Sequence, residues 1–501
     1  MATPIPAAFQ EIATLRSSQG KKALGRTRLI CTILLVLFAS LVIAQAAQGQ
    51  SEWTRQFGSA NGDGAAGVAV SASGVYVLGH TSGTLPGNVT GSGFAFLRKY
   101  DFSGNEVWTR QFGDVFVTSV VADSAGVYVA GRALITLPGQ TGAGLQDAFV
   151  RKYDADGNEV WTRQFGTVQD DQANGVAVDA TGVYVGGSSG AGFAFLRKFD
   201  SDGNLLWTQF IFISQSHTRV WALAADGSSV YIAGAVSDEA FVRKYDTNGI
   251  EVWTQPFGTP AEDTALGVAL DSSGVYVAGY TLGALAGASA GNYDVFVRKY
   301  DHDGNEVWTR QFGTAGFDFA AGIAAHGSAV YVGGSKDGAA FGVPTVSDGF
   351  VRKYDADGNE VWTRALSTEE EDFVTGVAAN ETGVFAAGAT SGVLPGQTSA
   401  GGRDAFVTRM NHLSAAQLIQ QLVAQVVALN LRQGITNSFD AKLQTVLNAL
   451  EDANQNNNAS AVNLLQAFIN GVEAQRGREL TSEQADALIA SALEIISVLC
   501  G

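Results

Sequence analysis

The sequence predicts an all-β seven-bladed β-propeller followed by a small all-α helical bundle, and three observations carry this prediction. The first is a set of seven tryptophans at intervals of 46 to 55 residues: Trp53, Trp108, Trp161, Trp207, Trp253, Trp308 and Trp362. The second is that each interval holds four short runs of β-branched and aromatic residues between Gly/Asp/Asn turns, which is typical of a propeller blade. The third is that Leu, Ala, Gln and Val recur at helical spacing after residue 411.

The four runs of a repeat predict four strands, which we name A to D in their order within a blade. Residues 175–179 (GVAVD) and 182–187 (GVYVGG) are examples of strands A and B. Residues 149–154 (FVRKYD) and 159–166 (EVWTRQFG) are examples of strands C and D. Each run is short, rich in β-branched and aromatic residues and bounded by turn residues, and we expect strand A of the first and third blades to begin at Gly67 and Gly175.

The two ends of the repeat array predict how the ring closes. The last strand C, at residues 406–411, is followed by helical sequence instead of a strand D. An unpaired strand D at residues 52–58 precedes the first strand A. If this N-terminal strand completes the last blade, the count closes at seven four-stranded blades and no sheet edge is left free.

Three elements of the repeat resemble the SBBP family of bacterial propeller repeats over residues 52–411. They are Gly-x-Ala-Val-Asp, Val-Tyr-Val-x-Gly and Asp-Ala-Phe-Val-x-Lys-x-Asp. The resemblance implies a propeller from an exported bacterial protein and no shared enzymatic activity. The hairpin at residues 154–161 also looks like the tryptophan-docking element of quinoprotein propellers.

The C-terminal stretch predicts four helices near residues 414–430, 438–452, 459–475 and 482–499, with Gly434, residues 454–458 and Gly477 in the connections. Ser414 to Gln417 and Thr481 to Gln484 read as capping boxes. The segments 464–470, 472–477 and 485–489 resemble the FIMAH module found at the ends of exported bacterial proteins.

The N-terminal residues have the features of a segment that directs export. Basic residues precede an apolar run at 29–43, and Ala44-Gln45-Ala46 offers a small-x-small cleavage site. We therefore expect a signal peptide at 1–47, a propeller at 48–411 and a helical bundle at 412–501, in a protein that is secreted or at the cell surface. An uncleaved membrane anchor is the alternative, although the run is shorter than the roughly 20 residues of a spanning helix.

Composition and motifs argue against several kinds of chemistry. The formal net charge of −17 argues against a nucleic-acid partner, because binding phosphates needs a basic surface. The five histidines share no register, and no nucleophile elbow, phosphate loop or zinc pattern occurs, so no catalytic residue, metal or cofactor is predicted. The Asp-x-Asp-Gly-Asn turns place Gly at position four, not six as in an EF-hand, which predicts tight hairpins.

Loop lengths and one repeated acid mark the candidate site. The D–A and B–C connections emerge on one face, and the B–C loops are long except in blades three and four, at 188–192 and 235–238. An aspartate recurs four residues before Gly67 and its equivalents: Asp63, Asp171, Asp263, Asp318 and Asp372. Blades two and four have Val115 and Thr218 instead. These residues form either a partial carboxylate ring that binds a cation or sugar hydroxyls, or caps that accept backbone N–H bonds.

These observations favour an exported, non-catalytic binding or scaffold protein, expected to be a monomer, that engages a glycan or protein through the long-loop face. One alternative is a propeller-type enzyme, either a quinoprotein-like oxidoreductase or a polysaccharide hydrolase or lyase. It predicts a charged central pocket lined by convergent polar groups. The other is a purely structural envelope repeat protein.

Overall fold

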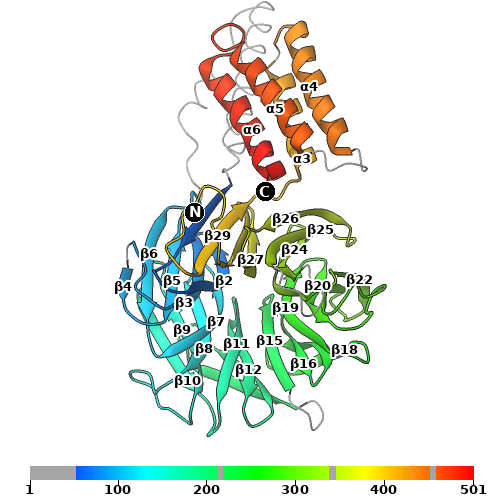
Figure 1. Cartoon of the computed structure of the whole chain (residues 1–501). Coiled ribbons are helices and arrows are strands. Elements are labelled where there is room, and N and C mark those ends of the chain that lie inside the picture. The colour runs from blue at the N-terminus through cyan, green and yellow to red at the C-terminus, as the bar shows by residue number, and fades with distance from the viewer. Residues whose placement is uncertain are drawn as a thin grey trace, which may run out of the picture. The chain divides into compact units, whose positions relative to one another are not determined.

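The computed structural model describes residues 52–87, 89–212, 218–337, 346–429, 431–451 and 458–500, so the predicted signal peptide at 1–47 lies outside the described residues. Seven antiparallel sheets are arranged around a central axis (Figure 1). Contacts between the A strands run from each blade to the next and return from β27 to β2, which closes the ring. The predicted seven-bladed propeller is confirmed.

The strands fall into seven blades, numbered in chain order. Blades one to three contain β2 (Asp63–Ser71), β3 (Gly74–Thr81), β4 (Val89–Gly91), β5 (Ala95–Tyr100) and β6 (Glu106–Phe112); β7 (Val115–Ala122), β8 (Val127–Ala133), β9 (Asp147–Tyr153) and β10 (Glu159–Phe165); and β11 (Asp171–Asp179), β12 (Gly182–Ser189), β13 (Ala194–Phe199) and β14 (Leu205–Ile211). The short strand β4 pairs in parallel with β6 and is an addition that the repeat does not predict.

Blades four to seven follow the same order. They contain β15 (Thr218–Ala225), β16 (Ser229–Val236), β17 (Glu239–Asp246) and β18 (Glu251–Phe257); β19 (Asp263–Asp271), β20 (Gly274–Thr281), β21 (Asp294–Tyr300) and β22 (Glu306–Phe312); β23 (Asp318–His326), β24 (Ala329–Asp337), β25 (Ser347–Tyr354) and β26 (Glu360–Leu366); and β27 (Asp372–Asn380), β28 (Gly383–Thr390), β29 (Asp404–Met410) and β1 (Trp53–Phe57).

The N-terminal strand closes the ring as predicted. Strand β1 pairs antiparallel with β29, with Trp53 opposite Arg409 and Phe57 opposite Ala405. Just before β1, the Glu52 carboxylate pairs with Arg364 of blade six and accepts the backbone N–H of Asn411 at 2.8 Å. Backbone pairing therefore joins the first and last strands of the propeller, and the charged contact ties the start of β1 to blade six.

Strand A is longer than predicted in every blade, because it continues through a β-bulge. In blade one, Ala65 pairs with Gly79 and Gly67 with Leu78, so Ala66 has no partner. The strand therefore begins at the aspartate, four residues before Gly67. A bulge lets a strand bend and twist without ending its hydrogen-bond ladder, which the alternation of residue types does not reveal.

The core lies between blades, not within them. Tyr76 and Leu97 of blade one pack with Val117 and Phe149 of blade two in one buried cluster, and equivalent clusters join the other neighbours. Each sheet is thus buried on both faces, which explains why strands B and C are buried at almost every position, including the charged residues of strand C.

Each repeated tryptophan docks onto the following blade. The indole N–H of Trp161 donates to the carbonyl of Ser201 at 3.0 Å, in the C–D turn of blade three. The other six tryptophans make the equivalent bond to Phe102, Ala155, Thr247, His302, Ala356 and His412. The tryptophans are therefore structural, and the docking geometry occurs at all seven junctions instead of at one hairpin.

Four helices follow: α3 (Ala415–Ala428), α4 (Gln433–Glu451), α5 (Asn458–Glu473) and α6 (Ser482–Cys500). They share a separate core that includes Leu422, Leu443, Phe468 and Leu488. Both capping boxes are confirmed, at Ser414–Gln417 and Thr481–Gln484. None of the described helices is both long enough and apolar enough to span a membrane.

The predicted start of the second helix is wrong. Gly434 lies in the first turn of α4 and not in a connection, since the N–H groups of Ile435 and Thr436 donate to the carbonyl of Arg432. Glycine is tolerated there because first-turn N–H groups have no helical partner to lose.

Candidate ligand-binding face

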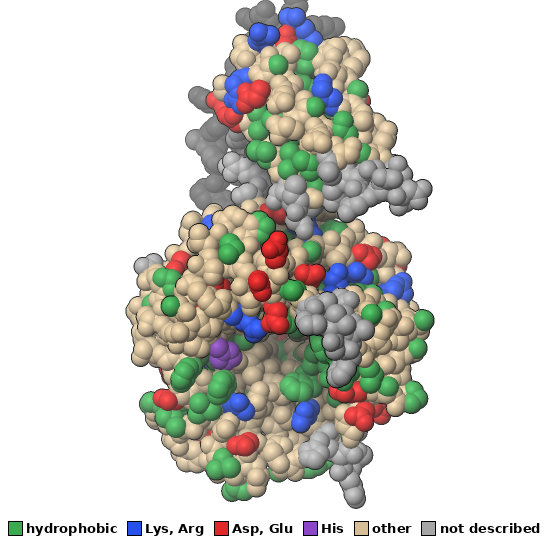
Figure 2. All heavy atoms as spheres, viewed as in Figure 1, with side chains coloured by type: hydrophobic (Ala, Val, Ile, Leu, Met, Phe, Trp, Pro, Cys, Tyr) green, Lys and Arg blue, Asp and Glu red, His purple; other side chains and the backbone are tan. Residues whose placement is uncertain are grey.

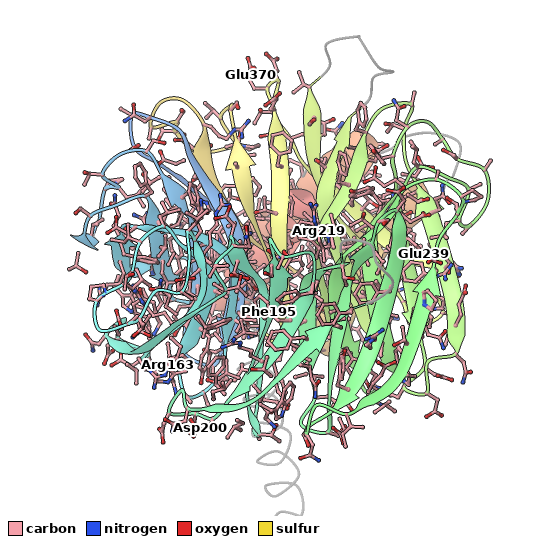
Figure 3. The ribbon with its side chains drawn as sticks, turned by 90° about the horizontal axis from the view of Figure 1, so that it is seen from below. Arg163, Phe195, Asp200, Arg219, Glu239 and Glu370 are labelled. Atoms are coloured by element: carbon pink, nitrogen blue, oxygen red, sulfur yellow. The ribbon has the colours of Figure 1, made fainter. Side chains whose placement is uncertain are left out.

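The connections divide between two faces of the ring. In Figure 3, Asp200 of a C–D turn and Glu370 of a D–A loop lie at opposite faces. The B–C connections are short in blades three and four, between β12 and β13 and between β16 and β17, as predicted. In blade six, strand B extends to Asp337 and strand C starts at Ser347. We call the face with the D–A and B–C loops the loop face.

The central channel is lined by the bulged segments of the seven A strands (the ring is hollowed at its centre in Figure 2). The lining residues are small or apolar, with four polar side chains and no titratable group among those described. Thr118 donates to the carbonyl of Ala173 at 2.6 Å, and Asn174 donates to that of Val220 at 2.8 Å. These polar groups therefore bond to the next blade. Trp221, which is outside the tryptophan register, lines the same channel.

A histidine, a phenylalanine and an arginine contact one another across blades one and two. The Nε2 atom of His80 accepts the backbone N–H of Val117 at 3.2 Å, and burial lowers the pKa of His80. Arg132 lies over the ring of Phe116 at 4.8 Å, and this ring is 41% exposed.

An aromatic cluster lies where the B–C connection of blade five meets the start of blade six. Tyr280, Tyr293 and Phe319 pack edge-to-face or tilted with centroids 4.9 to 5.5 Å apart, and Phe317 lies parallel to Phe319. Both tyrosine hydroxyls donate to the Glu262 carboxylate, at 2.9 and 2.8 Å. The bond to Glu262 and the burial of the ring raise the pKa of Tyr293 to about 12. The cluster offers ring surfaces together with an oriented carboxylate, and none of its residues is among the candidates predicted from the sequence.

The five predicted aspartates are buried at the starts of their A strands: Asp63, Asp171, Asp263, Asp318 and Asp372. In each, Oδ2 accepts the backbone N–H and the hydroxyl of the residue four positions earlier, with hydroxyl distances of 2.8 to 3.0 Å. This is the geometry of a cap on the D–A turn. None of the five lines the channel.

A second row of acids, which the sequence analysis missed, faces this first row. Asp147, Asp294 and Asp404 begin the C strands of blades two, five and seven and are buried. In each, Oδ2 accepts a backbone N–H from the residue four positions earlier and the side-chain amide of a strand D glutamine. Aligning the seven starts of strand C would have revealed them.

No protein-family model matches the chain. The regulatory protein FlaEY of Caulobacter vibrioides is 34% identical over 103 residues, or 18% of this chain, and the chain spans only 11% of that protein's length.

Similar solved structures include three with low TM-scores. They are a protein of unknown function from Bacteroides caccae (TM-score 0.36, 13% identity, 55% of this chain and 92% of that one), the Pan2 WD40 domain of Neurospora crassa (0.37, 10%, 59% and 90%) and a subtype N10 neuraminidase-like protein of bat influenza A virus (0.35, 8%, 68% and 93%).

Proposed function

We propose that this chain is an exported binding protein that holds a glycan through the loop face of its propeller. The observation that carries the proposal is the aromatic cluster of Tyr280, Tyr293, Phe317 and Phe319 beside Glu262. Such a cluster suits a small polar ligand that has apolar faces. The aromatic rings supply contact area, and the polar group fixes the orientation of the ligand. A sugar has both kinds of surface.

Loop geometry supports this assignment. The cluster draws on the B–C loop of blade five and on the D–A loops that precede β19 and β23, and such loops on a rigid scaffold are where ligands bind. A protein ligand would use the same surface. The propeller-enzyme alternative needs convergent acids, bases or nucleophiles in the channel, and the described channel residues include no titratable group that favours it over binding.

The test is a glycan array probed with the full chain, followed by calorimetry on any glycan that binds. We expect Tyr293→Ala to weaken binding at least tenfold through loss of ring contact, and Glu262→Gln to weaken it less while the fold is kept. Ile250→Ala, at an apolar position that is 64% exposed in a C–D turn, is the matched control and should bind like wild type. Equal binding by all variants, or no glycan ligand, would refute the proposal.

The finer assignments belong to the same proposal. We assign residues 52–411 to SBBP-type repeats and residues 412–501 to a FIMAH-like module, on the motifs GVYVGG, DAFVRKYD and 464–470. Export rests on the N-terminal segment, and a membrane location would follow only if that segment stays uncleaved. Intact-mass measurement of the secreted chain tests this, with loss of about the first 47 residues expected.

A further inference from the structure

Acidic residues occur in pairs at the junctions between blades. Where strand A begins with aspartate, the strand C of the preceding blade begins with an acid at the equivalent position. The five pairs are Asp404 with Asp63, Asp147 with Asp171, Glu239 with Asp263, Asp294 with Asp318 and Asp348 with Asp372. At the other two junctions both acids are missing, with Phe94 before Val115 and Phe193 before Thr218. A turn cap needs only the strand A residue, so the joint occurrence indicates that the two acids act together.

At three junctions, the two carboxylates converge on one glycine. A β-carbon on that glycine would stand closer than 3.0 Å to an oxygen of both aspartates. The glycines and their paired acids are Gly58 with Asp404 and Asp63, Gly166 with Asp147 and Asp171, and Gly313 with Asp294 and Asp318. The chain therefore keeps glycine where two buried acids meet, and no side chain fits between them.

Several of these carboxylate oxygens are buried without a protein donor. Asp63, Asp147 and Asp404 are each at most 3% exposed. Their Oδ1 atoms accept no hydrogen bond from any residue that the structure describes, although each Oδ2 accepts two. Burying a carboxylate oxygen without a partner is costly, and two such groups side by side repel each other. A bound cation would remove both costs.

We propose that these three junctions each bind one divalent cation, and that the cation is Ca²⁺. Carboxylate oxygens are hard ligands, and no imidazole or thiolate takes part. In the described parts of the chain, no group of three or more acidic, histidine or cysteine side chains is placed so that it could hold a metal ion. The two carboxylates must then share the ion with main-chain carbonyls and water, a mixed oxygen shell that Ca²⁺ accepts and Zn²⁺ does not favour. Each ion joins the strand C of one blade to the D–A turn of the next.

The test is calcium titration of the chelator-treated full chain by calorimetry, with thermal unfolding in parallel. We expect about three Ca²⁺ per chain with dissociation constants of about 10⁻⁴ to 10⁻³ M or tighter, as in extracellular modules. Calcium should raise the unfolding temperature. Asp404→Asn and Asp147→Asn, at two separate junctions, should each lower the stoichiometry by one.

The control is Asp355→Asn, in a C–D turn where both carboxylate oxygens already accept hydrogen bonds from Asp357 and Asn359. It should leave the stoichiometry unchanged. No calcium uptake at about 10 mM, or unchanged uptake in both junction variants, would overturn the proposal. If neither variant folds, the wild-type stoichiometry decides. Calcium uptake is measured without glycan, so its failure is separate from failure of the glycan site.

Discussion

Gly203 of blade three lies directly beneath the indole of Trp161 of blade two, and a β-carbon at Gly203 would stand 2.8 Å from Cδ2 of that indole. The glycine has φ +79° and forms the tip of the C–D turn whose carbonyls accept the Trp161 and Arg163 N–H bonds. The close approach and the left-handed backbone therefore both require glycine at this position.

The first prediction separates these two requirements. Gly203→Ala should destabilise the propeller by about 1–3 kcal/mol more than Gly139→Ala, because only the former pushes a methyl group into an indole. Gly139 has φ +72° and no atom within 4 Å of its missing β-carbon, so it reports backbone strain alone. Urea unfolding followed by tryptophan fluorescence measures both. Equal losses of unfolding free energy in the two variants would show that the contact with the indole does not restrict position 203.

The second prediction concerns the docking bond itself. Trp161→Phe keeps an aromatic ring but removes the donor to the Ser201 carbonyl, and we expect a loss of about 1–3 kcal/mol from the bond and the smaller ring. Val160→Ala, next in sequence but 54% exposed, should change the free energy of unfolding by no more than about 0.5 kcal/mol. A Trp161→Phe variant as stable as Val160→Ala would contradict a stabilising role for docking.

The blades could be predicted because each repeats one apolar pattern around one tryptophan. Ring closure could be predicted because the strand ending at Phe57 had no other partner. Two kinds of feature could not be predicted from the sequence. The bulge at Ala66 adds a residue without changing the residue types around it, and β4 is too short to leave a pattern.

The candidate site was harder to predict than the blades, for a physical reason. The five aspartates could be predicted as candidates because they recur at the same position in their blades. Their partners, such as Asp404, form the first residue of the strand C motif and were therefore assigned to the strand. The aromatic cluster joins Tyr280, Tyr293 and Phe319 from three segments, and only the folded ring brings them together. Contacts between blades leave no periodic signal within one blade.

The third prediction concerns ring closure. Deleting residues 1–58 removes β1, exposes the edge of β29 and leaves Arg364 without Glu52. Because an open strand edge pairs with other chains, we expect dimers or larger species by light scattering. Deleting residues 1–51 keeps β1 and Glu52 and is the matched control, which should stay monomeric. A monomeric 1–58 deletion would show that closure is not needed to protect the edge.

The fourth prediction concerns acid stability and His412. This residue follows β29, at the position that the C–D turn occupies in the other blades. Its backbone carbonyl accepts a hydrogen bond from the Lys353 ammonium at 2.7 Å. Its ring bonds to the Tyr331 hydroxyl at 2.7 Å through Nδ1 and to the Asn380 carbonyl at 2.6 Å through Nε2. Burial lowers the pKa of His412 below its ordinary 6.5, so the folded protein favours the neutral ring.

Because the unfolded chain takes up the proton more readily, the stability that His412 contributes is complete above about pH 6.5 and is lost as the pH falls through the folded-state value. We therefore expect His412→Asn to lose less free energy of unfolding than wild type between about pH 7.5 and pH 5, measured by urea titration. At about pH 8 the imidazole is neutral in both states, and the same comparison gives the cost of the substitution itself. Parallel pH profiles for the two proteins would show that a different group controls the acid sensitivity of this junction.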